Sequence, residues 1–120
     1  MVEPEYWKLA DTSGRQWSFT RECLEGLRRD LNVPLLVRVG PARDVLETLR
    51  ETFPFDALVS HEETGNQWTF ARDLAVKDWC AARGIAGREF PQSGVVRRLH
   101  GRDGWAARRE TYVRSPTLDP

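Results

Sequence analysis

The sequence predicts an α/β fold in which helices cover both faces of a parallel sheet, giving three layers. Two observations support this prediction. Segments with helical periodicity alternate with short β-branched and leucine-rich runs, and a glycine or proline separates most neighbouring segments. Such alternation is typical of parallel sheets with right-handed crossovers. The length of 120 residues favours one domain.

The first half of the chain is expected to contain a helix, a strand and a second helix. Ser13 and Gln16 form a capping-box pattern before a helix over about 15–31, whose apolar positions are Trp17, Leu24, Leu27 and Leu31. The run NVPLLVRVG predicts a strand over 34–39. A second helix is expected from Pro41 to near Phe53, with an apolar stripe of Val45, Leu46 and Leu49.

The second half is expected to contain a strand, a helix and another strand. DALVS predicts a strand over 56–60, and a second capping-box pattern, at Thr64 and Gln67, predicts a helix that ends before Gly84. The apolar face of that helix is expected to hold Trp68, Ala71, Ala75, Trp79 and Ala82. The run IAGREF predicts a strand over 86–90, parallel to the other two. In such sheets ligands bind beyond the carboxyl ends of the strands, here at 40–43, 60–67 and 91–95.

We place the α/β domain at residues 1–93 and interpret residues 94–120 as a basic exit segment. This segment contains six arginines and one short expected helix, from Asp103 to Val113. Arg97, Arg98, Arg102, Arg108 and Arg109 form a basic cluster with Trp105 among them. Such a cluster suits phosphate contacts as well as docking on an acidic neighbour, and we favour docking.

Composition excludes a membrane-spanning protein and gives no overall charge that points to a partner. The 18 basic residues balance the 18 acidic ones, so no global field favours nucleic acid or an anionic membrane. No apolar run approaches the roughly 20 residues that cross a bilayer. We interpret Cys23 and Cys80 as buried thiols, which suits a reducing cytoplasm.

The stretch SHEETGNQWTFARD, residues 60–73, concentrates polar and charged side chains between a strand and a helix. His61 lacks the second histidine four residues later that a zincin helix requires. The adjacent pair Glu62 and Glu63 is interpreted as solvated acids near a helix start, with acid–base chemistry as the alternative. Arg72 and Asp73 form either a surface pair or an anchor to another domain. The sequence contains no phosphate-binding glycine loop, dinucleotide-binding turn or nucleophile elbow.

Three parts of the sequence resemble the amino-terminal α/β domain of the DNA photolyase and cryptochrome family. They are SHEETGNQWTFARDLAVKDWCAARGI, then EFPQSGVVRRLHGRDGW, and upstream EPEYW with DTSGRQWSF. The resemblance implies a Rossmann-like domain that precedes a helical domain, which holds FAD and binds DNA. It also implies that the α/β domain can carry a folate or deazaflavin antenna. Because family members have a strand, a helix and a second strand before the counterpart of EPEYW, the sheet is expected to be incomplete.

Site residues follow from this resemblance by position. Glu62, Glu63, Asn66 and Trp68 are expected to line any antenna pocket, and the candidate contacts with the helical domain are Arg72, Asp73, Arg97, Arg98 and Arg102. No catalytic or metal-binding residue carries over. This chain is expected to hold no FAD and to repair no DNA alone, because the resemblance assigns both the flavin and the contact with DNA to the helical domain. The other interpretation left open is a free-standing small α/β module that binds a nucleotide or a protein without catalysis.

Overall fold

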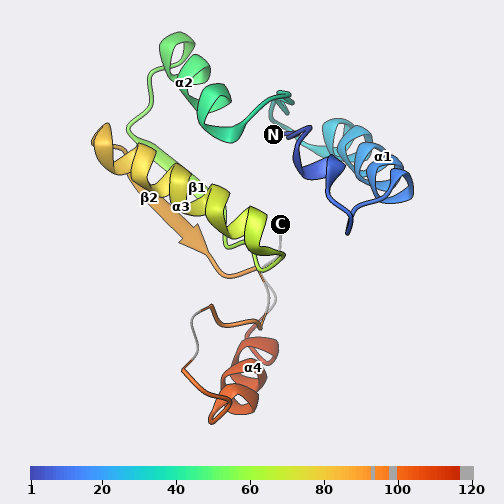
Figure 1. Ribbon diagram of the computed structural model, residues 1–120, viewed down its shortest axis with the longest axis vertical. Coiled ribbons are helices and arrows are strands. Elements are labelled where there is room, and N and C mark those ends of the chain that lie inside the picture. The colour runs from blue at the N-terminus through green and yellow to red at the C-terminus, as the bar shows by residue number, and fades with distance from the viewer. Residues whose placement is uncertain (93, 98–99, 117–120) are drawn as a thin grey trace. The chain divides into compact units, whose positions relative to one another are not determined.

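The computed structural model describes residues 1–92, 94–97 and 100–116, which form two compact units. The first unit, Met1–Phe55, contains the 3-10 helix η1 (Tyr6–Lys8) and helices α1 (Gly14–Asp30) and α2 (Ala42–Thr52). The second unit, Asp56–Pro120, contains β1 (Ala57–His61), α3 (Gln67–Ala82), β2 (Ala86–Phe90) and α4 (Trp105–Val113), as Figure 1 shows. The α/β class is confirmed, as part of a Rossmann-like arrangement. The division into a domain and an exit segment at residue 94 stays a prediction.

The two helices of the first unit begin close to where the sequence predicts. The Ser13 hydroxyl accepts a hydrogen bond from the Gln16 backbone N–H at 3.3 Å and caps α1. Pro41 precedes α2 and has no side-chain group that could cap it. A distant residue supplies this cap, because Oε1 of Glu3 accepts from the Ala42 N–H at 2.8 Å. Glu3 is only 7% exposed, so its carboxylate is a buried tie between the amino-terminal segment and α2.

The prediction of a strand over 34–39 was wrong in extent. Val39 forms an isolated parallel bridge with Val2, held by bonds from Val2 N to Arg38 O at 2.8 Å and from Gly40 N to Val2 O at 2.9 Å. The described residues show no strand over 34–38. A strand needs a continuous partner, and here the partner contributes a single residue.

The parallel pair in the second unit confirms the other two strand predictions. β1 and β2 pair from Ala57 opposite Ala86 to His61 opposite Phe90. α3 connects them as the crossover and packs against β2 (Figure 1). At this contact a Cβ atom added to Gly87 would lie 3.9 Å from the Cys80 sulfur, which places the thiol against the strand. The carboxyl ends of both strands therefore lie at the same edge, next to the start of α3.

The buried face of α3 is rotated from the face that the sequence predicts. Thr69, Trp79 and Cys80 are buried, whereas the expected positions Ala71 and Ala82 are exposed. Trp79 is the one residue of the expected apolar face that is buried. The small alanine side chains give only a weak apolar pattern. The packing of α3 against β2 therefore determines which face of the helix is buried.

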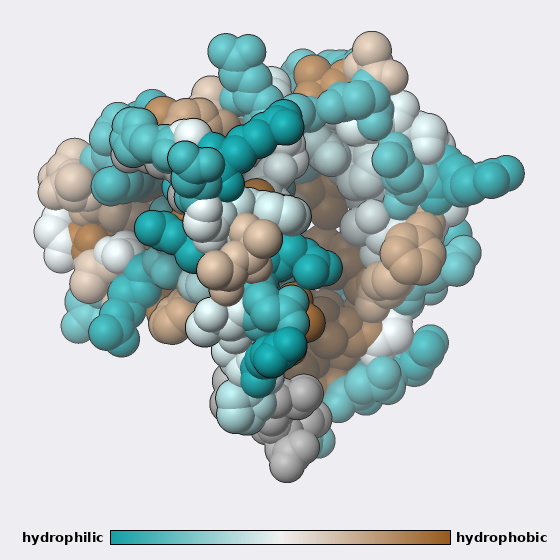
Figure 2. Space-filling model, turned by 90° about the horizontal axis from the view of Figure 1, so that it is seen from below, coloured by the Kyte–Doolittle hydropathy of each residue, from teal (hydrophilic) through white to brown (hydrophobic). Residues whose placement is uncertain are grey.

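Large apolar side chains remain at the surface in both units. Val59 in β1 is 63% exposed and Phe19 in α1 is 67% exposed. Figure 2 shows apolar side chains interleaved with hydrophilic ones on the face that it draws. Cys80 is buried as expected, but the expectation for Cys23 was wrong, because it is exposed on α1, a helix with no buried residue. No helix in the described part of the chain is both long and apolar enough to span a bilayer.

Candidate functional site

A short loop joins the carboxyl end of β1 to the start of α3 and contains three of the four residues expected to line an antenna pocket. Asn66 is the N-cap of α3: its Oδ1 accepts from the Thr69 N–H at 3.1 Å, and the Thr69 hydroxyl donates back to the Asn66 carbonyl at 2.9 Å. The expected cap at Thr64 was therefore wrong. Since α3 begins at Gln67, the preceding residue is the one that reaches the free N–H groups of the first turn.

Close packing, not a left-handed backbone, explains the glycine in this loop. Gly65 is not among the glycines with positive φ. A Cβ atom at Gly65 would lie 3.2 Å from the Thr69 hydroxyl oxygen and 3.5 Å from Oε2 of Glu63. The loop therefore folds tightly over the first turn of α3.

The four residues expected to line an antenna pocket share one level of burial. Glu62, Glu63, Asn66 and Trp68 are all half-buried, and the residues between them are exposed. Each of the four is thus supported by neighbouring atoms and still reaches solvent. The structure places them on one loop and helix start, and their role in lining an antenna pocket stays a prediction.

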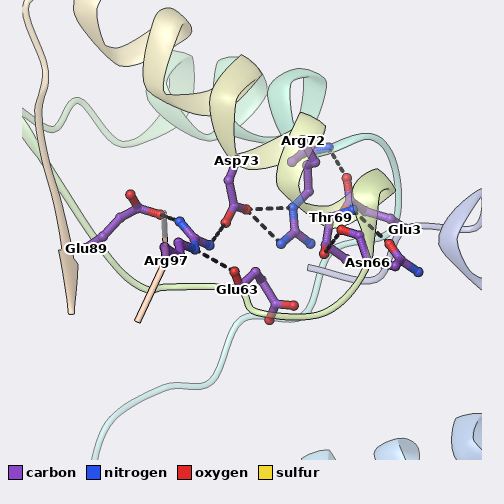
Figure 3. Close-up of polar contacts among 9 residues, drawn as sticks. Glu3, Glu63, Asn66, Thr69, Arg72, Asp73, Glu89 and Arg97 are labelled. Atoms are coloured by element: carbon purple, nitrogen blue, oxygen red, sulfur yellow. Dashed lines mark hydrogen bonds and ion pairs between the residues drawn. The ribbon is translucent and has the colours of Figure 1, made fainter. Parts of the chain in front are cut away.

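Arg97 joins three elements of the second unit (Figure 3). Its Nε donates to the backbone carbonyl of Glu63 at 2.6 Å, and Nη1 donates to Oε1 of Glu89 in β2 at 3.0 Å. Its Nη2 forms an ion pair with Oδ2 of Asp73 in α3. The guanidinium therefore ties the segment that follows β2 to the β1–α3 loop, to β2 and to α3.

Asp73 lies between two guanidinium groups. Its Oδ1 accepts from Nε of Arg72 at 3.2 Å and from Nη2 of Arg72 at 2.9 Å, while its Oδ2 meets Arg97 (Figure 3). The side chains of Asp73 and Arg97 are 15% and 16% exposed. Glu89 completes the group, in which two cations face two carboxylates. We call these four residues the Arg97 cluster: Arg72, Asp73, Glu89 and Arg97.

The charge of Arg97 is secured by its partners. Desolvation by burial lowers the pKa of Arg97, but the hydrogen bonds and attraction from Asp73 and Glu89 outweigh it, so the pKa lies above the ordinary value. The guanidinium is therefore charged whenever the chain is folded. Arg97 can therefore hold these elements together, but it cannot transfer a proton.

The structure joins three of the residues expected to contact another domain. Arg72, Asp73 and Arg97 meet inside the second unit, so the pair Arg72–Asp73 is linked to a residue 24 positions later than Asp73. Arg102 is exposed. Arg98 lies outside the described residues. The contact with a helical domain stays a prediction.

Sequence reasoning missed two members of these ties. In the sequence, Glu89 stands only in a predicted strand and Glu3 only in the stretch EPEYW. Glu89 lies near the carboxyl end of β2, next to the loop that holds Arg97, and an acid at a strand end opposite a polar loop is a signal that could have been used. Glu3 has no such local signal, because its partner lies 39 residues away.

Comparison with known proteins assigns the chain to a family. No curated protein and no solved structure gives a significant match. A family model described as DNA photolyase matches residues 1–100, which is most of the chain and includes both strands, α3 and Arg97. The chain therefore belongs to the DNA photolyase family.

Proposed function

We propose that this chain is the amino-terminal α/β module of a FAD-dependent photolyase or cryptochrome, and that its main role is structural. In this role the module fixes the position of the segment that leads from β2 towards the helical FAD domain. Light absorption by the flavin and any DNA repair belong to that other domain. Family membership supports the module, and the Arg97 cluster supports the role.

The observation behind this proposal is the set of contacts made by one side chain. Arg97 is the seventh residue after β2, and its guanidinium contacts a loop carbonyl, a strand carboxylate and a helix carboxylate. With these bonds in place, the start of the segment has one position relative to β1, β2 and α3. A helical domain joined through that segment would gain a fixed attachment, because fewer arrangements remain accessible to the linker. Arg102, which is exposed, would then be available for the contact itself.

The test uses the reading frame that surrounds the chain. We expect an in-frame helical FAD domain downstream, and the protein produced from the whole frame should contain about one flavin per chain, while the 120-residue chain contains none. Arg97→Met in the whole protein should reduce flavin content or blue-light activity, and Arg114→Met, in an exposed pair, should reduce neither. A chain that is encoded alone and binds a nucleotide or a protein would contradict the proposal and support a free-standing module.

An antenna role is a second candidate, which the shared half-burial of Glu62, Glu63, Asn66 and Trp68 favours. A planar folate or deazaflavin would stack on Trp68 and meet polar groups of the loop. One aromatic stack contributes about 1 kcal/mol, so the pocket also needs walls from neighbouring elements.

The antenna role is tested by Trp68→Ala in the whole protein, with Trp105→Ala as the matched control. We expect antenna occupancy to fall at unchanged folded yield for Trp68→Ala and to stay the same for the control. Unchanged occupancy with lost yield would assign Trp68 to packing alone.

A further inference from the structure

Helix α4 presents aromatic and basic side chains on one face. Trp105, Arg108, Arg109 and Tyr112 stand at positions i, i+3, i+4 and i+7, which cover an arc of about 100° on an α-helix. None of the residues of α4 is buried, and Trp105 and Tyr112 are 43% and 40% exposed. We call this the α4 face. Two rings at its ends flank two guanidinium groups at its centre.

The positive charge of the α4 face is not neutralised by the helix itself. The only carboxylate of α4 is Glu110, and its Oε1 accepts from Nε of Arg114 at 2.7 Å, on the opposite side of the helix. Arg108 and Arg109 have no ion pair among the described residues. The segment from 94 to 120 contains six arginines and three acidic residues, whereas the first 93 residues contain 12 basic and 15 acidic ones. The chain is therefore neutral overall but locally basic at α4.

The backbone of the segment contacts the α4 face at Arg109. A Cβ atom at Gly94 would lie 2.9 Å from Cγ of Arg109 and 3.6 Å from its Cα, so the aliphatic part of Arg109 packs on Gly94. Three residues later Arg97 is fixed by its cluster. Arg109 nevertheless remains exposed overall.

The composition of α4 distinguishes between two kinds of anionic partner. A helix that docks in a protein groove presents a continuous apolar face, whereas on α4 two arginines lie between the two rings and WAARRETYV contains no leucine, isoleucine or methionine. Rings that alternate with arginines are instead typical of surfaces that stack bases and pair with phosphates. Trp105 and Tyr112 are separated by about 10 Å along the helix axis, which matches about three stacked nucleotides.

We propose that the α4 face binds single-stranded nucleic acid without sequence preference, with Arg108 and Arg109 on phosphates and the two rings stacked on bases. This site is separate from the contact with DNA that the family resemblance implies for a helical domain. It does not depend on the proposed function and is present in the 120-residue chain.

The experiment measures binding of the 120-residue chain to a fluorescent oligothymidylate of about 12 nucleotides by anisotropy. We expect binding that weakens as salt rises from about 50 to 200 mM, and a loss of at least about tenfold for Arg108→Glu/Arg109→Glu. The matched control is Arg15→Glu/Arg43→Glu, which changes charge equally in the first turns of α1 and α2, where acids are favourable. This control should bind like the wild type.

Further variants separate stacking from charge. Trp105→Ala should weaken binding roughly fivefold or more, and Trp105→Phe should restore most of it, because the ring is kept. For Arg108→Ala/Arg109→Ala the slope of log affinity against log salt should fall by about 1.4, or about 0.7 for each lost phosphate contact. Circular dichroism of each variant checks that helix content is kept.

Three results would overturn the proposal. The first is no binding at the lowest salt. The second is an equal loss for Arg108→Glu/Arg109→Glu and for the control. The third is equal or tighter binding to polyglutamate with no effect of Trp105→Ala, which would assign the α4 face to an acidic protein.

Discussion

Replacing Arg97 by methionine should destabilise the chain far more than replacing an arginine of an exposed ion pair. Methionine keeps the aliphatic bulk and removes the three donors that reach Glu63, Asp73 and Glu89. A hydrogen bond that involves a charged group contributes about 1.5–3 kcal/mol when partly buried. The bond to Glu89 contributes little, because that side chain is 39% exposed and solvent screens the pair. Asp73 keeps Arg72 as a partner, so we expect a net loss of about 3 kcal/mol in the free energy of unfolding.

Urea unfolding followed by tryptophan fluorescence measures this loss. With a slope near 2 kcal/mol per molar urea, the midpoint should fall by about 1.5 M. The matched control is Arg114→Met, which breaks the ion pair with Glu110, whose two side chains are 78% and 51% exposed. The control should lower stability by less than about 0.5 kcal/mol.

A double-mutant cycle assigns the effect to one contact. Asp73→Asn keeps the shape of the side chain and removes its charge, and the coupling energy between Asp73→Asn and Arg97→Met should be about 1–2 kcal/mol. Additive effects, or equal losses for Arg97→Met and Arg114→Met, would refute the view that the Arg97 cluster fixes the segment.

The pH dependence of the free energy of unfolding tests the role of Arg97 independently. Because the pKa of Arg97 is raised in the folded chain, its contribution is complete below the ordinary arginine pKa and is lost only as pH rises from there through the pKa of the folded chain. No loss from this group should appear in the neutral range.

The remaining predictions concern the thiols, the cap of α3 and its end. Cys23 should react with a thiol reagent in the native chain and Cys80 only on unfolding, since burial blocks access and raises the pKa of the Cys80 thiol; equal labelling rates by mass spectrometry would contradict this. Stability should fall as pH rises above the thiol pKa of the unfolded chain, and Cys80→Ala should remove that slope. Asn66→Ala should cost about 1 kcal/mol in urea unfolding and Thr64→Ala clearly less. Gly84→Ala should cost about 1–2 kcal/mol, because Gly84 has φ 66° and alanine disfavours that conformation.

The elements that the sequence predicts well are those with a local signal. The capping hydroxyl of Ser13 and the apolar spacing after it define α1, and Gly84 ends α3 as the pattern indicates. β1 and β2 are short runs bounded by turn residues, and their parallel pairing follows from the helix between them. Each of these signals lies within a few residues of the element it defines, so one sequence is sufficient.

The contacts that the sequence does not predict join residues far apart in the chain. Glu3 caps α2 across 39 residues, and Arg97 reaches Asp73 across 24. Such pairs leave no periodic pattern, and their partners depend on how the elements pack. The strand expected over 34–39 failed for the same reason, because strand propensity is local but a ladder requires a distant partner.

Salt concentration should separate the two roles that we assign to arginines of the segment after β2. The ion pair of Arg97 with Asp73 is mostly withdrawn from solvent, so mobile ions screen it weakly. Arg108 and Arg109 lie on an exposed face. Single-stranded nucleic acid bound there would be held by phosphate contacts, which added salt weakens. A rise in salt should therefore release an oligonucleotide from α4 while the fold of the second unit persists. The same segment would then combine a fixed attachment at Arg97 with a binding surface at α4 that responds to the ionic strength of its surroundings.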